Sequence, residues 1–343
     1  MTSVLLLGAG ASRGTLGECA PVSPEFGTYL KRTISNWMEE YLYLAAAIRF
    51  LSQRLTDVSQ ESWALDKVWG AIDTRVKLQR IWGLDLPSMP SPHGWDSWGI
   101  AGFELTLVLA RVLGELLEAP IEEAVKRGGS IIVEIEKLKP GDCVISLNYD
   151  VLVERILDDV EKSWTRATPW YDAIHTGTIL LCKPHGSLNW KGYFPENGHP
   201  VEFLNGPMKE REITPKCHPC LVAPVPFKSE IIDSALQLTL APNLFHLLVA
   251  QWRSAIERLS KAGRLVVMGY GFPPEDLHAH YLFAEAAAKR EKDEKLQIEV
   301  FETCEQRFGE VRREIDKIFG PSGCKYSCEY KGAVRAEIKE SGT

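Results

Sequence analysis

Short apolar runs without polar alternation recur along this chain, and they restrict its fold more than any other feature. The clearest are residues 143–147 and 264–268, each bounded by Gly, Pro or Asp. Such runs suit the strands of a parallel sheet that is covered on both faces. Helical stretches lie between them, and strands that alternate with helices indicate an α/β fold. We therefore predict a Rossmann-like, doubly wound parallel sheet.

The expected elements can be placed from these runs and from helical periodicity. We expect strands at 3–7, 130–134, 142–147, 178–182, 220–223, 264–268 and 297–301, with a further one at 325–330. We expect helices at 151–163, 243–262, 275–291 and 305–319.

Residues 30–130 interrupt the alternation, because they have few β-branched runs and much helical periodicity. We predict that they form a helical insertion after the first strand, which leaves 1–29 and 131–343 as the Rossmann-like catalytic domain. Residues 189–219 are rich in Gly and Pro, and we expect an irregular loop or a small subdomain there.

Composition excludes several classes of protein. The 343 residues are 45% hydrophobic and 25% charged, as in globular proteins. A net charge of −7 disfavours strong direct binding to nucleic acid or to anionic membranes. No apolar stretch approaches the ~20 residues that span a bilayer, and the first residues do not resemble a signal peptide. We expect a cytoplasmic protein whose scattered cysteines are reduced.

A glycine turn follows the first expected strand, with the residues Gly8, Ala9, Gly10, Ala11 and Ser12. Glycine lets the backbone approach a ligand closely, and the start of a following helix suits a pyrophosphate. The dinucleotide-binding fingerprint would place a small residue three positions after Gly10, where this chain has Arg13. Similar turns also connect strands to helices without any ligand, so the turn alone leaves both interpretations open.

Three further motifs follow expected strands, at the edge where open parallel sheets bind ligands. Asn148 and Asp150 follow the strand at 142–147, and a helix cap would explain one of these two polar residues. His185 follows the strand at 178–182, although a lone histidine is more often structural. A second glycine turn, Gly269–Gly271, follows the strand at 264–268.

In this order, the four motifs resemble those of the sirtuin-like (silent information regulator-like) family. The match is closer to the prokaryotic sirtuin-like proteins of anti-phage defence than to protein deacylases. Deacylases continue the first motif as Gly-Ile-Pro-Asp-Phe-Arg, whereas this chain has Arg13–Gly17. Deacylases also carry a four-cysteine zinc module, whereas here Cys217 and Cys220 form a single pair. Structural zinc needs four ligands, so we expect no metal and a plain turn at this pair.

The resemblance implies that NAD is consumed as a substrate. It implies that Asn148 holds the ribose and the attacking water, that Asp150 orients the nicotinamide carboxamide and that His185 is the general base. The implied binding residues are, for the pyrophosphate, Gly8, Ala9, Gly10, Ala11, Ser12 and Arg13, and, for the adenosine half, Gly269, Tyr270 and Gly271. Glu302, after the strand at 297–301, is a candidate for contact with a ribose hydroxyl.

The expected function is therefore hydrolysis of NAD+ to ADP-ribose and nicotinamide, by an effector that depletes NAD in abortive infection. The resemblance also implies a homo-oligomer and a separate sensor, such as a HerA-type ATPase or an argonaute. The helical insertion is the expected docking region, although its tryptophans fit a core at least as well. Two alternatives stay open: an NAD-dependent protein deacylase, which needs an open groove beside His185, and a module that senses NAD or ADP-ribose without turnover.

Overall fold

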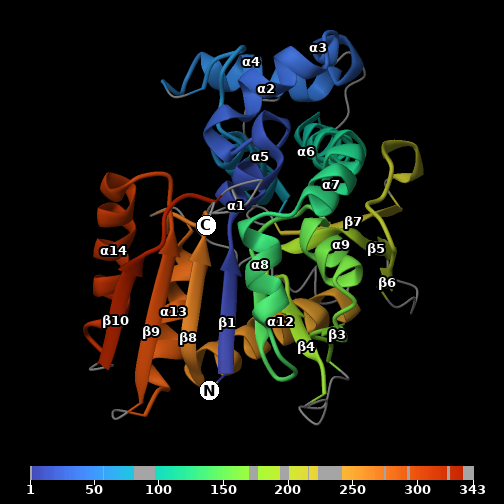
Figure 1. Cartoon of the computed structure of the whole chain (residues 1–343). Coiled ribbons are helices and arrows are strands. Elements are labelled where there is room, and N and C mark those ends of the chain that lie inside the picture. The colour runs from blue at the N-terminus through green and yellow to red at the C-terminus, as the bar shows by residue number, and fades with distance from the viewer. Residues whose placement is uncertain are drawn as a thin grey trace.

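Seven parallel strands form one central sheet in the order β10-β9-β8-β1-β2-β4-β3 (Figure 1). The computed structural model describes residues 2–56, 58–80, 97–169, 177–193, 201–214, 216–222, 242–273, 276–291, 294–322 and 325–334. The strands are β1 (Thr2–Leu7), β2 (Cys143–Ser146), β3 (Trp164–Arg166), β4 (Ile179–Cys182), β8 (Ala262–Met268), β9 (Lys295–Phe301) and β10 (Lys325–Tyr330). The predicted Rossmann-like α/β fold is confirmed.

Helices cover both faces of this sheet, as alternate residues of β1 show. Val4 and Leu6 face one apolar cluster and Leu5 and Leu7 face another, and all four side chains are buried. The first cluster is closed by α12 (Pro242–Ser260), α13 (Leu277–Ala288) and α14 (Glu305–Phe319). The second is closed by α1 (Ala9–Leu16), α7 (Leu116–Arg127), α8 (Ser130–Lys137) and α9 (Leu152–Asp159). None of the helices within the described ranges is long and apolar enough to cross a membrane.

The strand expected at 130–134 is wrong, because these residues lie in helix α8. The β-branched run that suggested a strand also has apolar side chains at helical spacing. Ile131, Ile132 and Ile135 are buried together against the cluster beneath the sheet. Packing of this helical face therefore outweighs the strand preference of the individual residues.

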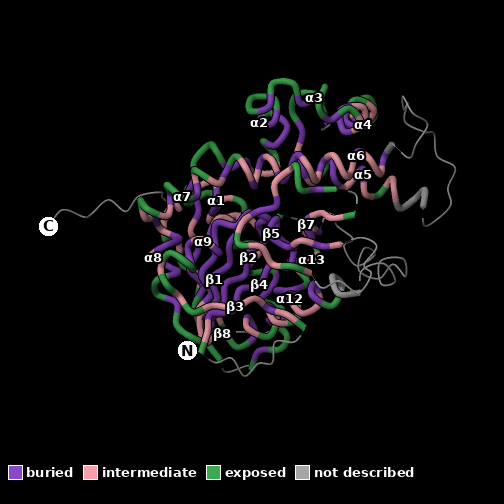
Figure 2. The backbone as a smooth tube through the Cα atoms, turned by 90° about the vertical axis from the view of Figure 1, so that its right-hand side faces the viewer, coloured by how far each residue is buried: buried purple, intermediate pink, exposed green. Residues whose placement is uncertain are grey.

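A block of helices lies over the carboxyl edge of the sheet (Figure 1). Its members are α2 (Phe26–Thr33), α3 (Trp37–Glu40), α4 (Leu42–Ser52), α5 (Leu65–Arg80), α6 (Ser97–Leu109) and a π-helical stretch, Ala110–Glu115. Trp37, Trp63, Trp69 and Trp98 are all buried in its core, while Trp82 and Trp95 lie outside the described residues. These four tryptophans therefore fill an interior. In Figure 2, the residues coloured as buried lie on the inner side of the block.

A second, antiparallel sheet occupies much of residues 189–219, for which we expected an irregular loop or a small subdomain. It has the order β6-β5-β7, with β5 (Gly186–Tyr193), β6 (Glu202–Phe203) and β7 (Cys217–Leu221). The strand expected at 220–223 corresponds to β7, and it belongs to this sheet instead of the central one. Leu188 and Met208 pack into the core of the helical block, so the small sheet joins that block to the rest of the protein.

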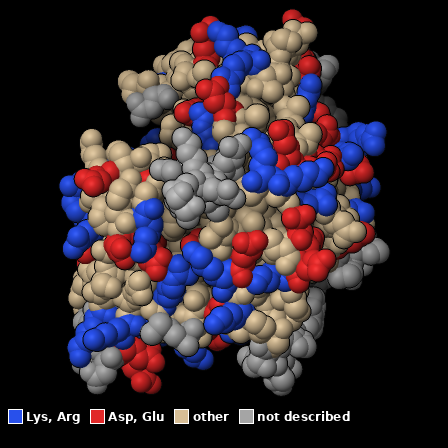
Figure 3. All heavy atoms as spheres, viewed as in Figure 1, with Lys and Arg blue, Asp and Glu red and all other residues tan. Residues whose placement is uncertain are grey.

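The order in which the chain adds strands to the sheet reverses beside β1. From β1 it builds the sheet outward through β2, β3 and β4, and it then returns to add β8, β9 and β10 on the other side of β1. Such a reversal is the point at which open α/β sheets bind ligands. On the face seen in Figure 3, acidic and basic side chains are interspersed, as 39 Lys and Arg against 46 Asp and Glu would suggest.

Candidate active site

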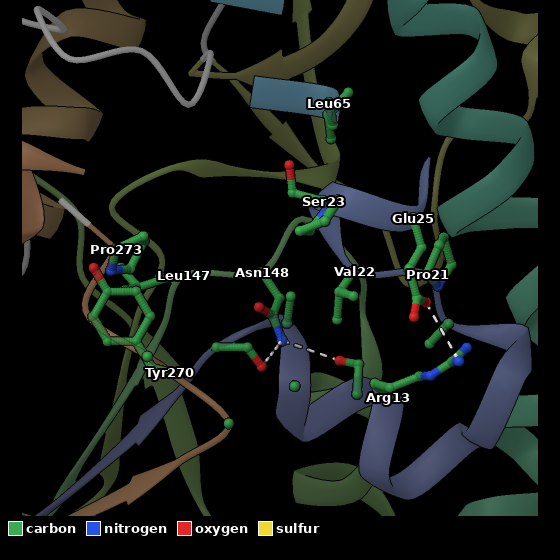
Figure 4. A pocket seen from close by; sticks show the side chains of 18 of the residues that line it. Arg13, Pro21, Val22, Ser23, Glu25, Leu65, Leu147, Asn148, Tyr270 and Pro273 are labelled. Atoms are coloured by element: carbon green, nitrogen blue, oxygen red, sulfur yellow. Dashed lines mark hydrogen bonds and ion pairs between the residues drawn. The ribbon is translucent and has the colours of Figure 1, made fainter. Parts of the chain in front are cut away.

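A cavity of about 1160 Å³ opens at the carboxyl ends of β1, β2, β8 and β9, where the chain changes direction (Figure 4). Of the residues predicted for the site, Ala11 is buried behind the cavity wall. The others all line the cavity: Gly8, Ala9, Gly10, Ser12, Arg13, Asn148, Asp150, His185, Gly269, Tyr270, Gly271 and Glu302. The structure therefore brings four motifs that are far apart in the sequence onto one surface.

The two glycine turns pack directly against each other. The amide of Gly10 donates to the carbonyl of Gly269 at 2.9 Å. A Cβ on Gly8 would lie 2.6 Å from that same oxygen, and a Cβ on Gly269 would lie 2.0 Å from the nitrogen of Ala11. Glycine is therefore required here for the contact between two loops. The sequence had suggested a different reason, the close approach of a ligand to the backbone.

Helix α1 begins at the floor of the cavity, directly after Gly8. It has no side-chain cap and no acidic residue in its first turn, and Ala9 is exposed. The positive end of the helix dipole therefore faces the cavity, which favours an anion. Arg13 extends from this helix toward Glu25 of a short 3₁₀ helix, Ser23–Glu25, and pairs with its carboxylate at 3.3 Å (Figure 4).

Asn148, Ser12 and Asp150 form a directed chain of hydrogen bonds. Asn148 Nδ2 donates to the carbonyl of Gly8 at 2.9 Å and to Ser12 Oγ at 3.0 Å (Figure 4). Because a carbonyl only accepts, the NH₂ group of Asn148 must face it. Ser12 Oγ then donates to Asp150 Oδ2 at 2.8 Å. No hydrogen bond to Asn148 Oδ1 occurs among the residues described, so this oxygen can accept one from a ligand.

Asp150 also caps the helix that follows it. Its Oδ1 accepts a hydrogen bond from the amide of Leu152 at 3.1 Å, as an Asx cap does. Burial raises the pKa of the Asp150 carboxyl, while the positive charge of Lys183 and the hydrogen bond from Ser12 oppose that rise. The cap interpretation thus accounts for Asp150 but not for Asn148.

His185 is held from both sides of its ring. Its Nδ1 lies 3.2 Å from the carbonyl of Leu147, which requires a proton on Nδ1 and places the lone pair of the neutral ring on Nε2. Nε2 lies 3.7 Å from Asp276 Oδ2. The rings of Tyr149 and Trp252 pack nearby, with centroids 6.3 and 6.2 Å away, and only 5% of the side chain is exposed. Nε2 is therefore suited to accept a proton that a nearby carboxylate would stabilise.

Sequence reasoning missed Asp276 and its hydrogen-bond partner. Tyr270 OH donates to Asp276 Oδ2 at 3.1 Å, and both residues line the cavity. Asp276 ends the stretch that begins with the second glycine turn, so its position after a strand was the available signal. Burial and the charge of Asp276 raise the pKa of Tyr270 well above its usual value, and this phenol therefore stays a donor.

Glu302 follows β9 and also lines the cavity. Only 9% of the residue is exposed, and its Oε2 accepts a hydrogen bond from the amide of Thr303 at 3.2 Å. A buried carboxylate with one such donor can accept further hydrogen bonds from ligand hydroxyl groups. Within the described part of the chain, no group of three or more His, Cys, Asp or Glu could hold a metal ion. The plain turn expected at Cys217 and Cys220 is wrong, because both residues lie in strand β7, which pairs with β5.

The fold and the cavity define the class of protein: a Rossmann-like α/β protein with a cavity where its strand order reverses. No protein-family model matches the chain, and no curated protein matches its sequence. Eighteen chains of solved structures match it. One of them, from "Structural Basis for the Mechanism and Regulation of Sir2 Enzymes", is 12% identical, with 93% of this chain and 92% of that chain covered and a TM-score of 0.29. A TM-score of this size does not support a functional inference.

Proposed function

We propose that this protein hydrolyses NAD+ at the bond between nicotinamide and ribose, releasing nicotinamide and ADP-ribose. The observation that supports this most is the meeting of Asn148 and His185 on one cavity, where the strand order reverses. One residue offers a hydrogen-bond acceptor and the other a base, and both belong to motifs that resemble those of sirtuin-like proteins.

The chemistry needs few catalytic groups, because nicotinamide is a cationic leaving group in NAD+. The bond between nicotinamide and C1′ breaks as positive charge develops on the ribose, as in glycoside hydrolysis. Asn148 Oδ1 holds the ribose hydroxyl or the attacking water, since both hydrogens of its amide are already bonded within the protein. Asp150 accepts the carboxamide N–H, because a carboxylate with two hydrogen bonds still has free lone pairs.

His185 removes the proton of the attacking water. The oxygen of water bonds to C1′, nicotinamide leaves as a neutral molecule, and the proton passes to Nε2 of His185. Asp276, 3.7 Å away, stabilises the imidazolium that forms. The start of α1 faces the pyrophosphate, and Arg13 reaches it by exchanging its ion pair with Glu25 for a phosphate oxygen.

Burial around His185 favours hydrolysis over deacylation. A deacylase needs an open groove beside its base to admit an acyl-lysine. Here the ring of His185 is 5% exposed, with Tyr149 and Trp252 packed near it. This low exposure is the observation that favours a water molecule over an acyl-lysine as the reactant beside Nε2.

We further propose that the biological result is NAD depletion in anti-phage defence. The order of the four motifs and their departures from the deacylase pattern support this role. A homo-oligomer and a separate sensor protein would keep such an activity silent until infection, and the helical block is our candidate for their docking.

The test is direct. The purified chain is incubated with NAD+ alone, and with NAD+ and an acetylated peptide, and nicotinamide and ADP-ribose are measured by chromatography. We expect both products without peptide. The variant His185→Ala should lose about 10²- to 10⁴-fold in rate, as removal of a catalytic base does. Asn148→Ala should also lose rate, because the ribose and the attacking water are then no longer held in position.

Matched variants control for general damage. Asn189 is also a buried asparagine whose Nδ2 donates to a carbonyl, that of Leu204, and His218 is a histidine beside the carbonyl of Pro219. Neither lines the cavity, so Asn189→Ala and His218→Ala should keep the rate wherever they stay folded. Turnover only with peptide would establish a deacylase, and binding of NAD+ without turnover a sensing module.

A further inference from the structure

Lys183 is the only buried lysine among the described residues, and it lies two positions before His185. It directly follows β4, and its exposed fraction is 0%. A buried ammonium group is stable only if all of its hydrogens have partners and its charge is compensated. The hydrogen-bond partners of Lys183 show what it does.

The three hydrogens of the Lys183 ammonium have three partners. Nζ donates to the carbonyl of Asp150, to Ser187 Oγ at 2.7 Å and to the carboxylate of Glu154 at 3.2 Å. Glu154 is buried as well, with 4% of its side chain exposed, so the ion pair is shielded from water. Three donors and three acceptors fully satisfy the group.

These partners come from two separate segments of the site. Asp150 and Glu154 belong to the loop after β2 and the helix α9 that follows it, whereas Lys183 and Ser187 flank His185 after β4. The ammonium therefore bonds the segment that carries Asn148 to the segment that carries His185. The hydrogen bond from His185 Nδ1 to the carbonyl of Leu147 joins the same two segments.

Loss of the ammonium would affect both segments. The carbonyl of Asp150 would lose its donor in a buried place, and the carboxylate of Glu154 would lose its counter-charge. The loop after β2 would then shift to find other partners. Catalysis is sensitive to such shifts, since displacement of a reacting group by about 1 Å can lower a rate about 100-fold.

We propose that Lys183 is a positioning residue, which holds Asn148 and His185 in the relative geometry that cleavage of NAD+ requires. This inference rests on the proposed function for its kinetic consequence. The structural consequence, which is the immobilisation of the His185 ring against Leu147, does not depend on the proposed function.

The test replaces both buried charges together. Lys183→Met with Glu154→Met removes both charges of the pair, while Arg166, which also interacts with Glu154, keeps the charge of Asp158 nearby. Apolar replacement of a buried ion pair is often tolerated. We expect a folded protein whose kcat for nicotinamide release falls about 10- to 100-fold with little change in KM. In nitrogen NMR spectra, the Nδ1–H signal of His185, assigned by its absence in His185→Ala, should be lost through faster exchange with water.

A partly buried ion pair provides the control, since 21% of the Arg264 side chain and 10% of the Glu299 side chain are exposed. Arg264 and Glu299 join β8 to β9 at 2.8 Å, and neither lines the cavity. Glu134, which also contacts Arg264, keeps Lys137 as a partner. The double variant Arg264→Met with Glu299→Met should therefore keep both kcat and the His185 signal.

If the Lys183 double variant unfolds, Lys183→Arg serves instead. It keeps a charge beside Glu154, but its planar guanidinium cannot reproduce the three bonds of an ammonium, so the same losses are expected. Wild-type kcat and an unchanged His185 signal in the folded variant would overturn the proposal, as would equal losses in the control. A wild-type protein that releases no nicotinamide would refute the hydrolase, while the NMR signal would still decide the role of Lys183.

Discussion

Replacing Gly269 with alanine tests whether the contact between the two glycine turns holds the cavity together. Gly269 has φ of 62°, and a Cβ there would lie 2.0 Å from the nitrogen of Ala11 and 2.2 Å from the carbonyl carbon of Gly10. Both of these are backbone atoms, so neither can rotate out of the way. The substitution therefore combines an unfavourable backbone conformation with a steric clash.

The size of the effect follows from these two contributions. A left-handed conformation costs a residue with a Cβ roughly 1–2 kcal/mol, and forcing an extra methyl group into a packed site costs about 1–3 kcal/mol. Together they predict a loss of about 2–5 kcal/mol, a large part of the roughly 5–15 kcal/mol by which a domain is stable. Because the clash pushes on Gly10, binding of ADP-ribose should weaken as well.

Gly17 provides a control without the clash, since its φ is also positive, at 67° with ψ of −145°, and no atom lies within 4 Å of a Cβ placed there. Gly17→Ala should lose only the conformational part. Urea denaturation of both variants gives the free energy of unfolding, and calorimetry with ADP-ribose gives the affinity. A loss in Gly269→Ala no greater than that in Gly17→Ala would refute the claim that the two turns require glycine for their contact.

Two further predictions concern buried ionisable groups. Burial raises the pKa of Asp150 in the folded protein. The stability contributed by the protonated carboxyl is therefore complete below the unfolded pKa of about 3.9, and it is lost as pH rises through the pKa of the folded state. As pH rises from 4 to 7, Asp150→Asn should therefore gain stability relative to the wild type, and it should lose nicotinamide release. Urea denaturation at both pH values measures the difference in the free energy of unfolding, and an unchanged difference would contradict this prediction. Burial also raises the pKa of Cys182, whose sulfur lies 3.8 Å from that of Cys143 in the core. Iodoacetamide should therefore label the exposed Cys19 and Cys304 first, and it should label the buried pair only in denaturant. Peptide mass spectrometry would contradict this if all four reacted at one rate.

Most of the central sheet could be predicted from the sequence, because its strands are continuous apolar runs between helices. Strand β3 (Trp164–Arg166) was missed, since three half-buried residues carry no periodicity. Helix α8 was predicted as a strand because Ile131 and Ile132 have a local preference that the packing of a whole helical face outweighs. The order of the strands, and hence the position of the reversal beside β1, is not encoded in any local run.

The residues of the cavity also divide into those that could be predicted from the sequence and those that could not. Each glycine turn, and Asn148 and His185, could be predicted from its place after a strand, because the carboxyl ends of parallel strands meet at one edge. The roles of Lys183 and Asp276 could not, since a buried ion pair and a carboxylate near a histidine depend on which loops become neighbours.

The sequence by itself determined the type of fold and the four motifs that meet at the cavity, because both depend on patterns within a few residues of each strand. Only the tertiary structure decided which of these residues touch. Gly8 and Gly269 belong to opposite ends of the chain, and their backbones meet only because β1 and β8 pair in the sheet. Hydrogen bonds and clashes act over a few ångströms, so such contacts are defined only once the strands have assembled.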